Sequence, residues 1–233
     1  MSQTTFKHLA IILDGNRRWA KEHNKHPGKG HQEGAKRVEE LLRWCKDLDI
    51  KELTLFTFSA QNFHRSSEEV SLLMKLFKDW FGRFKNKKEI KENDIQINFL
   101  GRTHLFPKEI QEIMEELTEH TKNHKTRILN FCMGYGGREE IIDAVKALTL
   151  DVKQGKVDPS KIDETLFGTY LTTTHQPQLI IRTGGAQRTS NFLIWQSFYS
   201  EWYFEKKYWP EFSKEDLQRI ISEYQTRERR FGK

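Results

Sequence analysis

One segment of the sequence, HLAIILDGNRRWA at His8–Ala20, joins an apolar run to residues that suit phosphate chemistry. The run ends at Asp14, and two arginines, Arg17 and Arg18, follow within a turn. The planar guanidinium of arginine binds phosphate oxygens through paired, charge-assisted hydrogen bonds. A carboxylate among such arginines repels an anionic ligand unless a cation lies between them, and Mg²⁺ binds one or two carboxylates together with substrate phosphates. Asp14 therefore fits a magnesium ligand, and equally a helix N-cap or an ion-pair partner of Arg17 or Arg18.

Three more segments place arginines, hydroxyls and glycines directly after short apolar runs. They are SAQNFHR at Ser59–Arg65, GYGGR at Gly134–Arg138 and RTGGAQRTS at Arg182–Ser190. Backbone N–H groups flanked by glycine add further donors for phosphate oxygens. A single arginine of this kind is more typical of a surface ion pair. Four such segments together indicate an anion-binding site.

The elements that must position these residues alternate between strand and helix patterns. Short, β-rich apolar runs occur at Leu9–Leu13, Leu53–Phe58, Ile95–Leu100, Ile128–Met133 and Leu179–Arg182. Segments with helical spacing separate most of these runs, which is typical of a parallel sheet wrapped by helices. We therefore predict a single α/β domain, residues 1–233, with a central, mainly parallel sheet of about six strands flanked by helices. Ligands of open parallel sheets bind beyond the carboxyl ends of the strands, where all four segments lie.

Five helices are expected, over residues 34–50, 66–84, 107–124, 138–153 and 214–230. The second begins with a serine cap, Ser66, and has Glu69 three residues later, the spacing of a capping box. It also carries large apolar side chains along one stripe, and such stripes normally pack in a protein core. The lysine-rich segment Lys85–Asn93 is expected to be a solvated loop.

The composition is that of a globular protein, with 36% hydrophobic and 31% charged residues. The apolar runs are too short to span a bilayer, and the N-terminal residues lack the apolar core of a signal peptide, which predicts a cytoplasmic protein. Cys45 and Cys132 have no spacing typical of a zinc site or a disulfide framework and are expected to be buried thiols. The net charge of +6 suits an anionic partner, either a small phosphorylated substrate or a polyanion.

Several common catalytic motifs are absent from the sequence. It contains no GxxxxGK[ST], no GxGxxG after a strand, no HExxH and no GxSxG, which argues against the usual nucleotide, zinc and acyl-transfer sites. It also has no DDxxD-type pair of acids, which all-helical prenyltransferases need for their metal cluster. A phosphate site in this chain must work with few acids.

The order of the motifs resembles that of the cis-prenyltransferase family. The matching segments are DGNRRWAKEH, GKGH, TFSAQNFHRSSEEV, MGYGGREEI, IIRTGGAQRTSNFLIWQSFYSEWYF, WPEF and RERRFG. The resemblance extends from His8 to Gly232, essentially the whole chain. The resemblance implies a homodimer with a parallel sheet and a hydrophobic tunnel, of which helix 66–84 forms one wall. It also implies Mg²⁺-dependent, successive addition of isopentenyl diphosphate to an allylic diphosphate, farnesyl or geranylgeranyl diphosphate, giving a long-chain cis-polyprenyl diphosphate.

The resemblance assigns roles to individual residues of this chain. Asp14 matches the essential aspartate that positions Mg²⁺, Glu201 matches a second acid near the metal, His31 matches a histidine near the departing group, and Asn62 matches an asparagine proposed to accept or organise a proton. Residues matching the allylic diphosphate site and its surroundings are Gly15, Asn16, Arg17, Arg18, Trp19, Ser59, Phe63 and Arg65. Residues matching the isopentenyl diphosphate site are Arg182, Arg188 and Ser190, and Arg230 and Gly232 match a C-terminal segment that reaches the neighbouring subunit's diphosphate.

Several positions depart from the family's usual pattern. Gln61, Gln178 and Ala186 each replace an acid, which predicts altered affinity for metal or substrate. Pro27 replaces an arginine upstream of His31, and Lys25 or Lys29 is expected to supply the lost charge.

Two alternatives to an active enzyme remain at this stage. One is a non-catalytic partner subunit of a cis-prenyltransferase complex, which is disfavoured because Asp14 is present. The other is a protein that binds RNA or polyphosphate, which is disfavoured because the cations lie at strand ends rather than in a broad stripe. For the enzyme itself we expect no nucleic-acid partner, and transient association with a membrane surface to release a lipid product.

Overall fold

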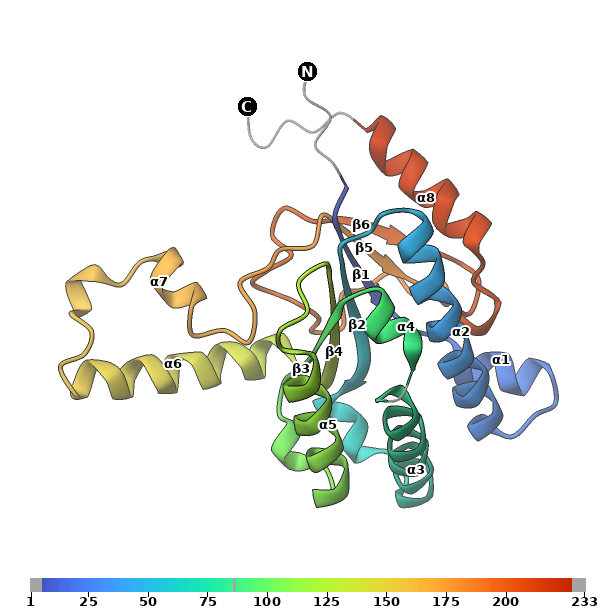
Figure 1. The fold of residues 1–233 in the computed structure, drawn as a ribbon, viewed down its shortest axis with the longest axis horizontal. Coiled ribbons are helices and arrows are strands. Elements are labelled where there is room, and N and C mark those ends of the chain that lie inside the picture. The colour runs from blue at the N-terminus through green and yellow to red at the C-terminus, as the bar shows by residue number, and fades with distance from the viewer. Residues whose placement is uncertain (1–5, 86, 228–233) are drawn as a thin grey trace.

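A computed structural model describes residues 6–85 and 87–227 of the chain (Figure 1). Their strands form one six-stranded, all-parallel sheet in the order β3-β4-β2-β1-β5-β6. The strands are β1 His8–Ile12, β2 Glu52–Ser59, β3 Ile95–Leu100, β4 Arg127–Tyr135, β5 Leu179–Arg182 and β6 Glu201–Phe204. This confirms the predicted α/β domain with a parallel sheet of about six strands.

All five apolar runs identified in the sequence form strands, and β6 is the additional one. β6 is only four residues long, and all four are half-buried at the edge of the sheet. It therefore lacks the continuous apolar run that marks a strand buried on both faces.

The helices are α1 Asn16–Glu22, α2 Pro27–Asp47, α3 Ser67–Phe84, α4 Lys88–Glu92, α5 Lys108–Thr121, α6 Gly137–Lys153, α7 Glu164–Gly168 and α8 Lys214–Thr226. α2 begins seven residues before the predicted start at 34, because Pro27 fits the first helical position and His26 accepts a hydrogen bond from the Gly28 N–H. α4 is a short helix within the segment that was expected to be a loop. None of the helices in the described residues is long and apolar enough to cross a membrane.

One face of the sheet is covered by α2, α3, α5 and α8, and the largest hydrophobic cluster lies between them. The other face is covered mainly by residues 183–200, through Phe192 and Leu193. Cys45 and Cys132 are both buried free thiols, as predicted, and burial raises the pKa of Cys45 to about 12. The site-bearing loops are thus attached to a sheet that is packed on both faces.

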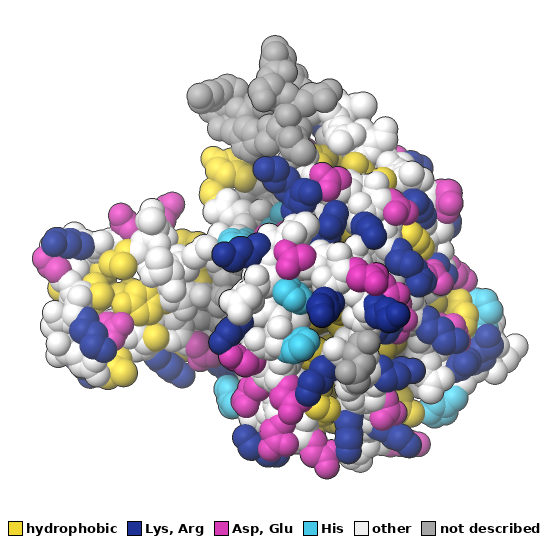
Figure 2. Space-filling model, in the orientation of Figure 1, with side chains coloured by type: hydrophobic (Ala, Val, Ile, Leu, Met, Phe, Trp, Pro, Cys, Tyr) yellow, Lys and Arg dark blue, Asp and Glu magenta, His cyan; other side chains and the backbone are white. Residues whose placement is uncertain are grey.

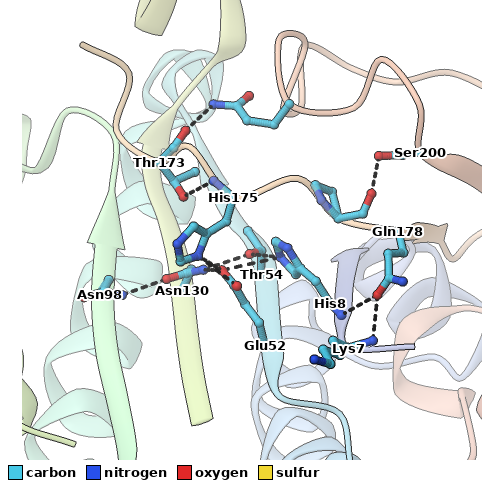
Figure 3. Close-up of polar contacts among 12 residues, drawn as sticks. Lys7, His8, Glu52, Thr54, Asn98, Asn130, Thr173, His175, Gln178 and Ser200 are labelled. Atoms are coloured by element: carbon cyan, nitrogen blue, oxygen red, sulfur yellow. Dashed lines mark hydrogen bonds and ion pairs between the residues drawn. The ribbon is translucent and has the colours of Figure 1, made fainter. Parts of the chain in front are cut away.

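A polar network crosses the sheet near the amino ends of the strands (Figure 3). The buried His8 on β1 makes a 2.9 Å hydrogen bond with Thr54 Oγ1 on β2, and Nδ2 of Asn130 on β4 donates to Thr54 and Glu52. His175, in the loop before β5, forms a 2.9 Å hydrogen bond between its Nδ1 and the Glu52 carboxylate. Burial of His8 lowers its pKa to about 4, despite the opposing effect of Glu52.

The depressed pKa of His8 makes stability depend on pH. Between pH 6.5 and 4 the unfolded chain binds a proton that folded His8 does not, so the unfolding free energy falls as the pH falls through this interval. The titration of His8 alone is expected to lower the unfolding free energy at pH 5 by about 2 kcal/mol relative to pH 7. Urea unfolding at both pH values should show a smaller difference in His8→Gln than in the parent. The exposed His64→Gln serves as the control, and an undiminished difference in His8→Gln would contradict the assignment.

Candidate active site

Parallel pairing places all four predicted segments at the carboxyl edge of the sheet, and three of them line one crevice. Ile12 at the end of β1 pairs with Phe56 of β2 on one side and with Arg182 of β5 on the other. The chain reverses its direction of travel across the sheet between β1 and β5, and such switch points form ligand-binding crevices. The fourth segment, Gly134–Arg138 at the end of β4, instead borders a separate cavity of about 260 Å³ with Arg102 and Asp143. Its backbone still contacts the loop after β5, because the Gly137 and Arg138 N–H groups donate to Asn191. The fourth segment therefore adjoins the other three, but Arg138 does not line the crevice.

The Asp14 carboxylate lies between two arginines. One oxygen accepts a 3.0 Å hydrogen bond from Arg18 Nη2, and the other accepts a 2.7 Å bond from Arg182 Nη2. The Asp14 N–H donates to Thr183 Oγ1, and the Asp14 carbonyl accepts from the Trp209 N–H. The ion-pair interpretation of Asp14 is thus correct for Arg18, while the N-cap position of α1 belongs to Gly15.

Arg182 is the most buried cation of the site, with 4% of its side chain exposed. Its Nη1 donates to the Arg188 carbonyl and to Ser190 Oγ, each at 2.6 Å. Its Nε is buried and has no hydrogen-bond partner among the described residues. Arg182 therefore contacts the Ser190 side chain and the Arg188 backbone, and their role in binding isopentenyl diphosphate stays a prediction.

Gly15 and Arg18 fix the other side of the crevice. Gly15 has φ +108°, and a Cβ there would lie 2.6 Å from Cδ1 of Tyr208, so a side chain is excluded on both grounds. Arg18 Nη1 donates to the Gly184 carbonyl at 2.6 Å, and the guanidinium lies over the Tyr208 ring. The loop after β1 is thereby joined to the loop after β5.

His31 lies inside α2 with 11% of its side chain exposed, so it is neither the helix cap nor the surface residue that its sequence context alone would favour. Burial, followed by the charge of Arg65, lowers its pKa to about 4, which leaves the imidazole neutral near pH 7. Its Nε2 is buried without a hydrogen bond to any part of the chain that the structure describes. A neutral ring with a free nitrogen can hydrogen-bond a ligand in the adjoining cavity.

Glu69 is a site residue that the sequence analysis did not assign. Its carboxylate accepts a 2.9 Å hydrogen bond from Arg65 and lies 3.6 Å from His31 Nε2 and 3.5 Å from Arg17 Nη1. The capping spacing after Ser66 was the only signal for it in the sequence, and the Glu69 N–H does donate to Ser66 Oγ. The Glu69 carboxylate itself, however, lies beside Arg65, Arg17 and the imidazole of His31 at the crevice.

Glu69→Gln is expected to lower kcat/KM about tenfold, because a hydrogen bond to a charged group is worth roughly 1.5–3 kcal/mol and Arg65 and Arg17 lose their shared carboxylate. Steady-state kinetics with the substrates that the family resemblance implies would measure this. Glu68→Gln, which changes the exposed neighbouring acid, is the control. Unchanged or improved kcat/KM in Glu69→Gln would show that Glu69 does not position these groups.

Two cavities meet at Asp14. One, of about 590 Å³, is lined by basic side chains of Arg17, Arg18, Lys21, Lys25, Arg65 and Arg188. The other, of about 620 Å³, continues inward between α2, α3 and the sheet, and its deep walls are Val38, Leu73, Leu76, Phe77, Trp80, Phe81 and Phe131. Leu13, Asp14, Asn16, His31, Arg65 and Arg188 border both cavities. A ligand with an anionic head and an apolar tail fits this combination.

The last residue of β2, Ser59, lines the larger cavity together with Gln61 and Asn62 of the following turn, η1 Ala60–His64. Asn62 Oδ1 accepts the Ser59 N–H at 3.0 Å, which fixes the turn. Phe63 packs against Phe58 and Phe106 instead. Trp19 is buried and stacks on His23, so the structure places both aromatic side chains in packing contacts rather than at the crevice.

Glu201 lies away from Asp14 within a single chain. It starts β6 opposite Leu179, about 10 Å along the sheet from the carboxyl edge at roughly 3.3 Å per residue, and its carboxylate is bound by Arg227. The prediction that Glu201 and Asp14 share a metal is therefore not met within this chain. A motif match does not reveal which end of a strand a residue occupies. The predicted residues Arg230 and Gly232 lie outside the described residues.

The departures from the family pattern also differ in their placement. Gln178 accepts the Lys7 and His8 N–H groups at the amino end of β1, far from the crevice. Pro27 and Lys25 line the basic cavity, whereas Lys29 pairs with Glu33. Lys25 is thus the residue placed to supply the lost charge, and the expected effect of Gln178 on the site has no structural support.

Mg²⁺ fits this site only if the protein, water and substrate phosphates together supply its ligands. Among the described residues, no three His, Cys, Asp or Glu side chains gather to hold a metal by themselves. Asp14 is a single, partly exposed carboxylate facing the basic cavity. Mg²⁺ commonly binds one carboxylate and completes its shell with water and substrate phosphates, so Asp14 is a sufficient protein ligand.

The comparisons with known proteins agree with this geometry. Residues 12–232 match the family model described as "Putative undecaprenyl diphosphate synthase". The chain belongs to the undecaprenyl diphosphate synthase family. It is 48% identical over 229 residues to a Pyrococcus horikoshii protein named tritrans,polycis-undecaprenyl-diphosphate synthase (geranylgeranyl-diphosphate specific), covering 97% of this chain and 87% of the relative. A Methanocaldococcus jannaschii protein of the same name is 46% identical, with coverage of 97% and 82%.

One solved structure is also similar to this chain in fold and sequence. Lavandulyl diphosphate synthase from Lavandula x intermedia, in complex with dimethylallyl diphosphate, has a TM-score of 0.94 and 34% identity over 98% of this chain and 99% of that chain. The resemblance inferred from the motifs is thereby confirmed, and the chain is an enzyme of the prenyltransferase class.

Proposed function

We propose that the protein is a Mg²⁺-dependent cis-prenyltransferase that adds isopentenyl diphosphate repeatedly to an allylic diphosphate, giving a long-chain, undecaprenyl-like cis-polyprenyl diphosphate. Geranylgeranyl diphosphate is the proposed primer, because the relatives from Pyrococcus horikoshii and Methanocaldococcus jannaschii are named as specific for it. The observation that carries the proposal is the junction of the basic and apolar cavities at Asp14. Their sizes fall within the usual range for small-molecule sites.

In this proposal each diphosphate has its own set of groups. The allylic diphosphate lies in the basic cavity beside Arg17, Arg18 and the Gly15 loop, with its prenyl tail in the apolar cavity. Isopentenyl diphosphate lies at Arg182, Arg188 and Ser190. Arg18 and Arg182 each donate a hydrogen bond to Asp14 in the free protein. Each guanidinium can therefore exchange its hydrogen bond with the carboxylate for one with a phosphate oxygen.

Charge stabilisation of the departing diphosphate is the main chemical task of the site. The bond between the allylic carbon and the diphosphate oxygen breaks, and its electron pair leaves with the diphosphate. Mg²⁺, when held by Asp14, supplies positive charge for that leaving group. Arg18, Arg17 and the neutral His31 ring stabilise the same oxygens by hydrogen bonds.

The alkene of isopentenyl diphosphate then forms the new carbon–carbon bond with its π electrons, and loss of one proton restores a double bond. Asn62 lines the cavity beside this position, but an amide is too weak a base to act alone. A phosphate oxygen or a water molecule therefore accepts the proton, and Asn62 orients the acceptor. The cis geometry follows from the face that the second substrate presents to the allylic carbon.

The experiment is to incubate the protein with geranylgeranyl diphosphate, radiolabelled isopentenyl diphosphate and Mg²⁺, and to size the extracted products. Labelled polyprenyl products that disappear on adding EDTA are expected. Folded protein that binds both substrates but incorporates no label would be a non-catalytic partner subunit. Salt-sensitive binding of RNA or polyphosphate without incorporation would favour the polyanion alternative.

A homodimer is proposed from an exposed apolar face. α6 and α7 project from the body as an arm, and hydrophobic side chains gather on it (Figures 1 and 2). Ile142, Val145 and Leu150 along α6 are each about half exposed. Apolar side chains grouped in this way mark protein interfaces. Sedimentation analysis should give a dimer for the parent and a monomer for Ile142→Glu, whereas a monomeric parent would contradict the proposal.

We also propose a cytoplasmic protein that contacts a membrane surface only transiently, since its product is a lipid. Flotation with liposomes in the presence and absence of substrates tests this. Substrate-dependent flotation is expected, and its absence would mean that another component accepts the product.

A further inference from the structure

Glu139, in the first turn of α6, joins the two halves of the site through its two carboxylate oxygens. Oε1 accepts a 2.7 Å hydrogen bond from Nε2 of Gln61, and Oε2 accepts a 2.7 Å bond from Nδ2 of Asn191. Gly136 makes room for this bridge, because a Cβ there would overlap Glu139 Oε2 and lie 2.6 Å from Asn191 Nδ2. None of the three residues that form this bridge, Glu139, Gln61 and Asn191, is among the site residues assigned from the sequence.

The Gln61 end of the bridge belongs to the turn that faces the prenyl chain. Gln61 precedes Asn62 in η1, and both border the apolar cavity. Ser59, at the start of this turn, is held by Asn62. A displacement of Gln61 therefore moves the residue that is proposed to orient the proton acceptor.

The Asn191 end belongs to the loop that surrounds Arg182. Ser190 and Asn191 have φ values of +50° and +64°, a left-handed conformation that asparagine tolerates but that is unfavourable for Ser190. Besides its bond to Glu139, Asn191 accepts the Arg138 N–H through its side chain and the Gly137 N–H through its carbonyl. These contacts hold the left-handed turn on α6, and the turn places Ser190 Oγ 2.6 Å from Arg182 Nη1.

We infer that Glu139 is a positioning residue that sets the isopentenyl diphosphate loop in register with the Asn62 turn. This inference rests on the proposed function. Glu139 does not touch the reacting atoms and acts through Gln61 and Asn191. Its loss should raise the KM for isopentenyl diphosphate more than the KM for the allylic substrate, because the strained turn of the loop depends on it directly.

The same geometry explains the amide at position 61. A carboxylate there would lie within hydrogen-bond distance of the Glu139 carboxylate with no proton to share, and like charges at this separation repel. Exchanging the two groups restores a donor and an acceptor, because a glutamine at 139 donates to a glutamate at 61 and still accepts from Asn191 through its amide oxygen. Two carboxylates at positions 61 and 139 are therefore excluded, whereas any pair that contains at least one amide can still form a hydrogen bond.

The test measures kcat and both KM values for the parent, Gln61→Glu, Glu139→Ala, Glu139→Gln and the double variant Gln61→Glu/Glu139→Gln, with Asp151→Asn on the same helix as control. Gln61 is exposed, so these variants are expected to fold. Gln61→Glu and Glu139→Ala should each raise the KM for isopentenyl diphosphate about tenfold, the size of one lost hydrogen bond to a charged group. Glu139→Gln should have a smaller effect, because the Gln61 amide can turn to accept a hydrogen bond from the new amide. The double variant should return to within about threefold of the parent.

The outcomes separate the possible explanations. If net charge alone mattered, Glu139→Ala would lower the KM for an anionic substrate, so a lowered or unchanged KM in this variant overturns the inference. A double variant no better than the worse single variant also overturns it. A parent protein that incorporates no isopentenyl diphosphate would instead contradict the proposed function, and then binding of isopentenyl diphosphate by calorimetry still decides whether Glu139 positions its loop.

Discussion

Asp14→Asn is expected to lower kcat/KM by about a thousandfold. Charge stabilisation by a bound metal is worth several kcal/mol, and each 1.4 kcal/mol corresponds to about a factor of ten. Asparagine keeps the size of the side chain but removes the charge that would hold Mg²⁺ and that now pairs with Arg18 and Arg182. Steady-state incorporation of labelled isopentenyl diphosphate over a range of Mg²⁺ concentrations would measure the loss.

Stability must be followed in the same variant, because Arg182 is buried and loses its carboxylate partner. Removing one member of a buried ion pair costs up to about 3–5 kcal/mol, and less here because Asp14 is 26% exposed. Asp143→Asn removes an acid from another arginine pair, with Arg102, and should leave activity unchanged. Asp14→Asn protein that is folded and retains Mg²⁺-dependent activity within tenfold of the parent would exclude Asp14 as the metal ligand.

Phe81→Leu is expected to lengthen the products by at least one five-carbon unit, and Phe81→Ala by more. Phe81 is fully buried and forms part of the deep wall of the apolar cavity together with Trp80 and Phe131. A growing prenyl chain that reaches this wall must stop or displace it, and close-packed aromatic side chains resist displacement. Sizing of the extracted products by chromatography would show the change.

The control for the deep wall is Phe84→Leu. Phe84 is equally buried and packs on Trp80 and Phe131, but it is not part of the cavity wall formed by the described residues. Both leucine variants should lose comparable stability, whereas Phe81→Ala should lose about 3–5 kcal/mol. Identical product lengths in Phe81→Leu, Phe81→Ala and the parent would mean that the chain does not grow toward this wall.

The sequence predicts the fold and the core of the site for a clear physical reason. Strands buried on both faces are continuous apolar runs, so β1, β2, β4 and β5 are visible in the sequence, and parallel pairing brings their carboxyl ends together. The contact between Asp14 and Arg182, which are 168 residues apart, follows from that rule. β6 is too short and too exposed to give the same signal.

Other parts of the site depend on information that local patterns do not contain. Glu69 has the spacing of a helix cap, and only packing shows that its carboxylate faces Arg65 and His31. Glu201 matches a motif but sits at the opposite end of its strand from the crevice. The volume of the apolar cavity depends on side chains from α2, α3 and β4 together.

The most direct measurement is a crystal structure with Mg²⁺, isopentenyl diphosphate and an unreactive thio analogue of geranylgeranyl diphosphate. We expect the allylic diphosphate beside Asp14 and Arg18, its tail running between α2 and α3 toward Phe81, and the second diphosphate on Arg182 and Ser190. An allylic diphosphate bound away from Asp14, or a tail lying outside the apolar cavity, would contradict this assignment of the site.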